Sequence, residues 1–156
     1  MTKAELKEFL DAKVLEYNHP KFLEDDPIQI PHAFNRKEDI EISAFLTATI
    51  AWGNRKSIIN NATKLMELMG NTPYDFVINH SEEDLERLSP FVHRTFNGID
   101  LGYFVTSLPN IYNNHGGLEA VFTQHPPTES MHPAMPKSKH RYFELPNTTR
   151  TKTPVP

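Results

Sequence analysis

Apolar residues recur at helical spacing along most of the first 122 positions of the chain. The first helix is predicted over residues 3–17, where a stop follows at His19-Pro20. Thr2 and Glu5 match a capping box at its start. The apolar positions of this helix share one face and are Leu6, Phe9, Leu10, Val14 and Tyr17. Residues 20–36 contain Asp26-Pro27 and Ile30-Pro31, which favour an ordered but irregular connection.

The most apolar segment is predicted to be a helix over residues 38–52. Nine of the thirteen residues 40–52 are apolar, and they fall on nearly all helical faces. That distribution is typical of a helix surrounded by other helices. Glu38, Asp39 and Glu41 suit the positive end of its dipole. We therefore expect this helix to lie at the centre of the fold.

Further helices are predicted from their caps and their periodicity. A helix over 55–69 ends before Gly70, a second one begins at Pro73 after Thr72, and Ser81 caps a third. Asn97-Gly98 forms a turn before a helix capped by Asp100, and residues 118–122 form a last short helix. No stretch alternates strongly enough to predict a strand. The predicted fold is all-α, a bundle of about five to seven helices around the buried central helix.

The character of the chain changes after this helical domain, which is predicted to span residues 1–122. Residues 123–156 hold 7 of the 13 prolines and 5 basic against 2 acidic groups. Such a segment buries too little surface to fold alone, so we expect a basic, poorly structured and extended tail. The chain has no closing helix and reads as the front part of a longer fold that has been cut short.

Composition narrows the function classes. The 156 residues include no cysteine, which excludes disulfides and thiol chemistry and suits a cytoplasmic location. No apolar run approaches the roughly 20 residues of a membrane span, and the N-terminus is not a signal peptide. The net charge of −4 combines an acidic body with basic islands at 51–70 and 123–156, unlike the uniformly basic surface of a strong DNA-binding protein.

Familiar catalytic motifs are missing from the sequence. It has no glycine-rich phosphate loop, no GxSxG and no HExxH. His32, His93 and His115 show no ligand spacing to one another, so neither a metal nor a cofactor is expected. The paired acids at 25–26 and 38–39 show no convergence on a cleft and are interpreted as capping and solvated groups. The catalytic residues are therefore unknown.

The segment TIAWGNRKSI, residues 49–58, joins the central helix to the next one. Gly53 and Asn54 are expected to end one helix and cap the other, which places Arg55 and Lys56 at the positive end of a helix dipole. A phosphate bound at that helix start would explain the two cations, and the alternative, which we favour, is that both point into water. Trp52 is expected in the core, and the alternative is that it stacks on a base.

A second basic position lies in the segment FVHRTF, residues 91–96. Phe91 and Phe96 are expected to anchor this loop to the core on either side of His93 and Arg94. Arg94 would then be presented to a phosphate. The alternative, which we favour, is that Arg94 pairs with a nearby acidic residue.

Several segments in order resemble a bacterial family of conserved hypothetical proteins, the domain of unknown function 2400. They are PH at 31–32, DIEI at 39–42, AWGNR at 51–55, PYDF at 73–76, FVHR at 91–94 and GLEAVF at 117–122. The likeness extends over residues 15–152 and includes FELP at 143–146 and TRT at 149–151. Membership of this family implies no established activity.

The same helix, corner and helix remotely resemble the N-terminal half of the helix-hairpin-helix DNA glycosylases. That likeness implies weak, salt-dependent DNA binding, with Trp52, Asn54, Arg55, Lys56 and Arg94 near the cleft. The glycosylase corner is rich in Gln and Thr, which this one lacks, and the catalytic aspartate would follow Pro156. The chain alone is therefore expected to lack base-excision activity. The alternatives are a helical protein-interaction module, and a non-functional remnant that oligomerises through exposed core surface.

Overall fold

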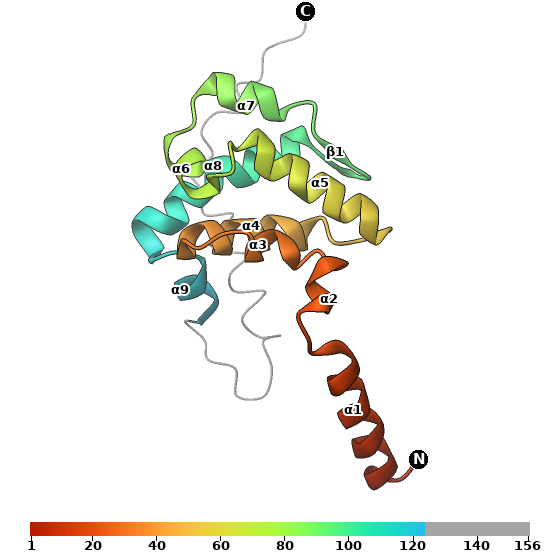
Figure 1. Ribbon diagram of the computed structural model, residues 1–156. Coiled ribbons are helices and arrows are strands. Elements are labelled where there is room, and N and C mark those ends of the chain that lie inside the picture. Colours follow the sequence, from red (N-terminus) through yellow and green to blue (C-terminus); the bar gives the residue numbers. More distant parts are fainter. Residues whose placement is uncertain (124–156) are drawn as a thin grey trace, which may run out of the picture. The chain divides into compact units, whose positions relative to one another are not determined.

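A computed structural model describes residues 1–123, and these are helical apart from their turns and one small hairpin, which confirms the all-α prediction (Figure 1). The chain divides into two compact units, residues 1–72 and the part from Pro73 onward. The first holds α1 (Lys3–Tyr17), α2 (Lys21–Glu24), α3 (Gln29–His32), α4 (Lys37–Thr49) and α5 (Arg55–Leu68). The second holds α6 (Pro73–Asn79), α7 (Glu82–Leu88), β1 (Val92–His93), β2 (Phe96–Asn97), α8 (Gly98–His115) and α9 (Leu118–Thr123).

The described residues therefore contain nine helices, more than the predicted five to seven, because residues 20–36 are not irregular. They form the four-residue helices α2 and α3, and Ile30 and Pro31 of α3 are buried. Proline is tolerated in the first turn of a helix, where backbone N–H groups have no partner within the helix. Pro31 lies in that turn, so the proline that indicated a break is compatible with a helix.

The first helix, α1, has the predicted boundaries and the predicted capping box. The Thr2 N–H donates to Glu5 Oε2 at 2.7 Å, and the Glu5 N–H donates to Thr2 Oγ1 at 3.3 Å. None of its residues is buried, and its apolar face is exposed, with Phe9 at 53% and Val14 at 56%. The amphipathic pattern therefore predicted the helix correctly, but this face does not pack into the core of the first unit.

The centre of the first unit is α4, which contacts α3 and α5. Ile42, Leu46 and the following Ile50 are at most 1% exposed, as expected for the central helix. The helix ends at Thr49, three residues before its predicted end. The next helix, α5, begins at the predicted Arg55, and its end is closed by Gly70 with φ +64°. The Asn71 N–H donates to the Met66 carbonyl at 2.9 Å, the bond of a Schellman motif.

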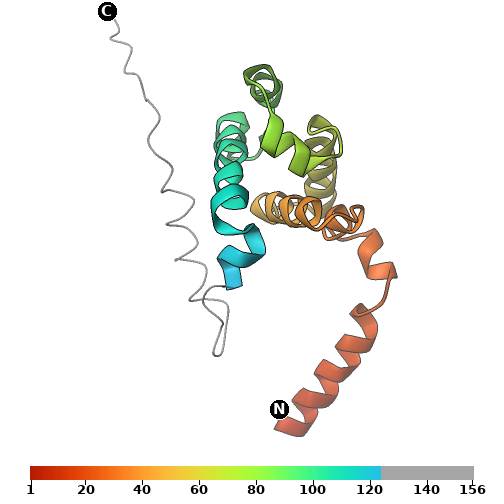
Figure 2. The same cartoon turned by 90° about the vertical axis from the view of Figure 1, so that its left-hand side faces the viewer.

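The second unit is organised along α8, which Figure 2 shows along its length with α9 at its C-terminal end. This helix contacts α6, α7, β2 and α9, and its residues Leu101, Val105 and Leu108 are fully buried. Asn97 caps it by accepting from the Ile99 and Asp100 N–H groups at 2.8 and 3.3 Å. Its first residue, Gly98, lies so close to the Ser89 backbone that an added Cβ would be 2.2 Å from the carbonyl oxygen.

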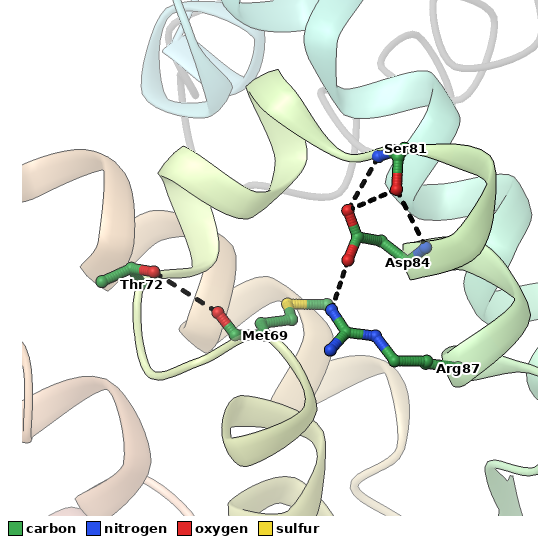
Figure 3. A network of polar contacts seen from close by, with 5 residues as sticks. All are labelled: Met69, Thr72, Ser81, Asp84 and Arg87. Carbon is green, nitrogen blue, oxygen red and sulfur yellow. Dashed lines mark hydrogen bonds and ion pairs between the residues drawn. The ribbon is translucent and has the colours of Figure 1, made fainter.

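A second capping box begins α7 in this unit (Figure 3). The Ser81 N–H donates to Asp84 Oδ2 at 2.8 Å, and the Asp84 N–H donates to Ser81 Oγ at 3.2 Å. The Ser81 hydroxyl also donates to Asp84 Oδ2 at 2.9 Å. The hydrogen bonds that the Ser81 N–H and hydroxyl donate to this carboxylate, together with the ion pair to Arg87, hold the pKa of Asp84 below its ordinary value. Figure 3 also shows the Thr72 hydroxyl of the first unit, which donates to the Met69 carbonyl at 3.4 Å.

The two-stranded hairpin of β1 and β2 was not predicted. Val92 pairs with Asn97 and His93 with Phe96, in an antiparallel arrangement. Strands of two residues are too short to show an alternating pattern, which explains why periodicity missed them. Phe91 and Phe96 are buried as expected, with ring centroids 6.2 Å apart. The proline-rich tail predicted over 123–156 lies outside the described residues, apart from Thr123, which ends α9.

Candidate functional site

A cleft of about 420 Å³ opens where α4 turns into α5, and we call it the corner cleft. All of its lining residues belong to the first unit. Side chains before and within α3, along α4 and at the start of α5 form its apolar walls, namely Pro27, Ile28, Pro31, Ala44, Ala48 and Ile58. Asp26, Thr47 and Arg55 supply its ionisable and hydroxyl groups. The cleft is therefore mostly apolar, with one carboxylate and one guanidinium, and the Thr47 hydroxyl oxygen is buried in its wall.

The corner itself forms as the sequence predicted. Gly53 has φ +104°, a conformation that favours glycine, and it allows the chain to reverse after Trp52. Asn54 is the N-cap of α5, and its Oδ1 accepts from the Ser57 N–H at 3.2 Å. Gly53 and Arg55 both line the cleft, so the turn brings the start of α5 to its edge.

The start of α5 keeps a strong positive character. The Asn54 side chain satisfies the Ser57 N–H alone, and no hydrogen bond in the described chain uses the N–H groups of Arg55 and Lys56. Both side chains are exposed, neither forms an ion pair with a described residue, and the first turn contains no acidic residue. Unpaired cations and free N–H groups together make this helix start attractive to an anion.

Thr47 is the unusual residue of the cleft wall. It is 4% exposed, and its Oγ1 has no hydrogen-bond partner among the described residues. Other hydroxyls of α4 bond to the preceding turn: Ser43 Oγ donates to the Ile40 carbonyl at 3.1 Å, and Thr49 Oγ1 to the Phe45 carbonyl at 2.8 Å. A buried hydroxyl without a partner costs about 1–3 kcal/mol. Thr47 therefore offers an unused hydrogen-bonding group beside the cleft.

Asp26 supplies the only carboxylate among the cleft's lining residues. Its Oδ1 accepts from the Ile28 N–H at 3.0 Å, which fixes the turn before α3. No hydrogen bond or ion pair in the described chain uses its second oxygen. The cleft thus carries one formal negative charge at Asp26 and one formal positive charge at Arg55.

The residues that the sequence grouped as a nucleic-acid site have different roles and different exposure in the structure. Arg55 lines the cleft, Asn54 acts as a cap, and Lys56 is exposed without lining it. Trp52 is 39% exposed, so its expected place in the core is wrong. The reason is the early end of α4 at Thr49, after which Trp52 no longer follows the buried face of that helix.

Arg94 belongs to the second unit, at the tip of the hairpin. It is exposed, and no ion pair joins it to an acidic residue in the described chain, which contradicts the favoured interpretation that it pairs with one. Its φ is +56°, a left-handed conformation that costs a residue with a side chain about 1–2 kcal/mol. The two-residue connection between paired strands imposes this conformation.

Sequence reasoning missed Asp26 and Thr47 as parts of one site. Asp26 was interpreted as a capping or solvated acid, and nothing local links it to a corner 27 positions or more away. Thr47 carried a weak signal, since it is a polar residue within the most apolar segment of the chain. The described residues contain no group of three or more His, Cys, Asp or Glu side chains that could hold a metal ion.

The fold and the site define an all-α protein whose first unit has an open, mostly apolar cleft beside a positively charged helix start. The chain belongs to the family described as protein of unknown function (DUF2400), whose model matches residues 26–155. That range begins at Asp26 and contains the whole corner cleft. No curated protein and no solved structure matches the chain. None of the helices in the described part is long and apolar enough to cross a membrane.

Proposed function

We propose that this protein binds DNA weakly, in a salt-dependent manner, by placing a backbone phosphate at the start of α5. The observation that carries the proposal is the pair of free N–H groups beside the unpaired side chains of Arg55 and Lys56. Phosphates bind at helix starts through such N–H groups, and each added cation strengthens the attraction.

The other residues predicted from the sequence differ in the contacts that they would add. Arg94 is an exposed cation on the second unit and would bind a further phosphate. Trp52 exposes 39% of its surface, which leaves part of its ring accessible for stacking on a base. Asn54 is the exception, because its side chain is committed to the Ser57 N–H and serves the corner rather than a ligand.

The proposal includes a remote relation to the helix-hairpin-helix DNA glycosylases. Its support is the succession of an apolar helix, a short corner and an amphipathic helix, which α4, the segment TIAWGNRKSI at residues 49–58 and α5 follow. No catalytic role is assigned to any residue of this chain, and the chain alone is proposed to lack base-excision activity. A cytoplasmic location belongs to the same proposal and rests on the absence of cysteine from the sequence.

The test is fluorescence anisotropy with a labelled duplex, intact or carrying an abasic site, at several salt concentrations. Each phosphate contact makes the slope of log K against log salt more negative by about 0.9, so replacing both Arg55 and Lys56 with Gln, which removes the proposed contact, should make the slope less negative by about 1. Lys64→Gln is the matched control, because it removes an exposed cation from the same helix away from its start. Absence of binding at low salt, or an equal loss in the control, would contradict the proposal.

The exposed face of α1 supports a second candidate function, a helical protein-interaction module. Its apolar residues lie on a helix without any buried residue, as expected for a surface that a partner or a second copy covers. Sedimentation velocity tests self-association through this face. Replacing Leu10 and Val14 with Glu should convert an oligomer into a monomer, and a wild-type protein that is monomeric at high concentration would exclude self-association.

A further inference from the structure

We propose that the corner cleft binds a small zwitterion of the α-amino-acid type with an aliphatic side chain. This ligand is different from DNA, and the proposal does not depend on the proposed DNA binding. It rests on four features that lie together in the cleft: a free helix start with Arg55, a carboxylate at Asp26, an unpartnered hydroxyl at Thr47 and apolar walls.

The helix start and Arg55 form the part of the cleft that would bind a carboxylate. Arg55 lines the cleft, its N–H donates no hydrogen bond within the described chain, and its guanidinium has no acidic partner there. A carboxylate accepts up to four hydrogen bonds and pairs with a guanidinium in a bidentate manner. The start of α5 therefore supplies both the donors and the charge that a ligand carboxylate requires.

Asp26 gives the cleft an opposite charge, which selects against ligands that are only anionic. Its carboxylate lines the same cleft and holds the Ile28 N–H through Oδ1, so its second oxygen is left for a ligand donor. An ammonium group satisfies that oxygen, whereas a second anionic group on the ligand would be repelled. One base and one acid in a single cleft match a molecule that carries one charge of each sign.

The walls determine the remainder of the ligand. Two prolines and small alanine side chains leave a volume of about 420 Å³, within the range of roughly 300–1,000 Å³ typical of small-molecule sites. No aromatic ring lines the described cleft, so it has apolar surface for an aliphatic chain but no face on which to stack a ring. The Thr47 hydroxyl is buried beside the cleft, so a small movement of the wall would let it bond to the polar end of the ligand.

The experiment titrates L-leucine into the full chain by isothermal calorimetry. Two analogues remove one charge each: 4-methylpentanoate lacks the ammonium group, and 3-methylbutylamine lacks the carboxylate. If both charges are recognised, leucine should bind about tenfold or more tightly than either analogue. Failure of leucine to bind at about 10 mM, or equal binding of all three compounds, would overturn the proposal.

Variants locate the binding in the cleft. Arg55→Gln and Asp26→Asn should each weaken leucine binding about tenfold or more, and asparagine retains the oxygen that holds the Ile28 N–H. Ala48→Phe should abolish leucine binding, because Ala48 lines the cleft and a phenyl ring would fill it. Ala48 is exposed, so this substitution should leave the protein folded and still tests the site if Arg55→Gln or Asp26→Asn unfolds. Lys56→Gln is the matched control, because Lys56 neighbours Arg55 without lining the cleft.

The same control separates this proposal from DNA binding. Lys56→Gln should weaken binding to the duplex and leave leucine affinity unchanged, whereas Ala48→Phe should remove leucine binding. Equal losses of leucine affinity in Lys56→Gln and Arg55→Gln would show that general positive charge, rather than the cleft, attracts the ligand, and would refute the assignment.

Discussion

Replacing Thr47 with valine should increase the free energy of unfolding of the protein. The side chain is 4% exposed, and its hydroxyl has no partner in the described chain, so folding removes this group from water without compensation. That uncompensated loss costs about 1–3 kcal/mol. Valine has nearly the same shape and a similar helix propensity, and it replaces the hydroxyl with a methyl group. We therefore expect a gain of about 1–3 kcal/mol.

The matched control is Ser43→Ala on the same helix. Ser43 is fully buried, but its hydroxyl donates to the Ile40 carbonyl at 3.1 Å. Alanine loses a hydrogen bond worth about 1 kcal/mol and regains about half of that in helix propensity. This variant should therefore be neutral or slightly less stable than the wild type. The sign of the difference between the two variants does not depend on the global stability of the chain.

Urea denaturation followed by tryptophan fluorescence measures both variants. The only tryptophan of the chain, Trp52, lies in the same unit as Thr47, so its signal reports the unit that the substitution changes. The midpoint should rise for Thr47→Val without a change in the m-value. A valine variant that is less stable than the wild type, or that gains no more than Ser43→Ala, would refute the reasoning. Such a result would mean that the hydroxyl is satisfied in solution.

Three further predictions concern the second unit and can be checked together. Gly98→Ala should destabilise the second unit by about 3 kcal/mol or more, since the added Cβ would overlap a backbone carbonyl. Gly102→Ala in the same helix should stabilise the unit by about 0.5–1 kcal/mol, because a Cβ there would have no atom within 4 Å. Thermal unfolding measures both variants, and equal changes in the two would contradict the prediction. The capping interaction of Asp84 contributes stability above the unfolded pKa and loses it as the pH falls through the lowered folded pKa. Ser81→Ala removes the hydroxyl hydrogen bond but keeps the backbone N–H that donates to the carboxylate, so the Asp84 pKa should rise only part of the way toward its ordinary value in an NMR titration, and an unchanged pKa would exclude the hydroxyl as a contributor. Arg94→Gly should relieve the left-handed conformation and stabilise the hairpin by up to about 1 kcal/mol in urea denaturation while weakening DNA binding, and a loss of stability would argue against strain at this position.

The helix boundaries that the sequence predicted well are those set by local chemistry. The start of α1 follows from Thr2 and Glu5, the start of α5 from Asn54, and the end of α5 from Gly70. Each of these signals acts within four residues of the position that it determines. Two errors arose where the local signal was ambiguous or too short. A proline in the first turn of α3 was interpreted as a break, and strands of two residues offered no period to detect.

The exposure of side chains was predicted less well, because it depends on contacts between distant segments. The apolar stripe of α1 has the period of a helix that packs on a core, yet none of its residues is buried. Trp52 was assigned to the core as the last apolar residue of the helix predicted over 38–52, and the end of α4 at Thr49 leaves it 39% exposed. Periodicity reports which residues share a face, but it does not report what that face contacts.

The candidate site shows the same division between local and distant information. Arg55 and Asn54 could be placed at a helix start because a cap and a cation lie side by side in the sequence. Asp26 and Thr47 join Arg55 only through the packing of α3, α4 and α5. The apolar walls were equally hidden, since prolines and alanines in different segments form a cleft only after the helices have assembled.

The start of α5 differs from the starts of α4 and α7 in a way that stability alone does not explain. The first turns of α4 and α7 carry acidic residues, Glu38 and Asp39 in one and Glu82, Glu83 and Asp84 in the other. Acidic groups there are favourable by about 0.3–1 kcal/mol each, and cations are unfavourable by similar amounts. In α5 the first turn instead holds two cations, and a hydroxyl that costs about 1–3 kcal/mol lies in the wall of the adjoining cleft. Locally unfavourable features that gather in one place are expected at a binding site, where a ligand supplies the missing partners. The corner cleft is therefore the first place in this protein to test for a ligand.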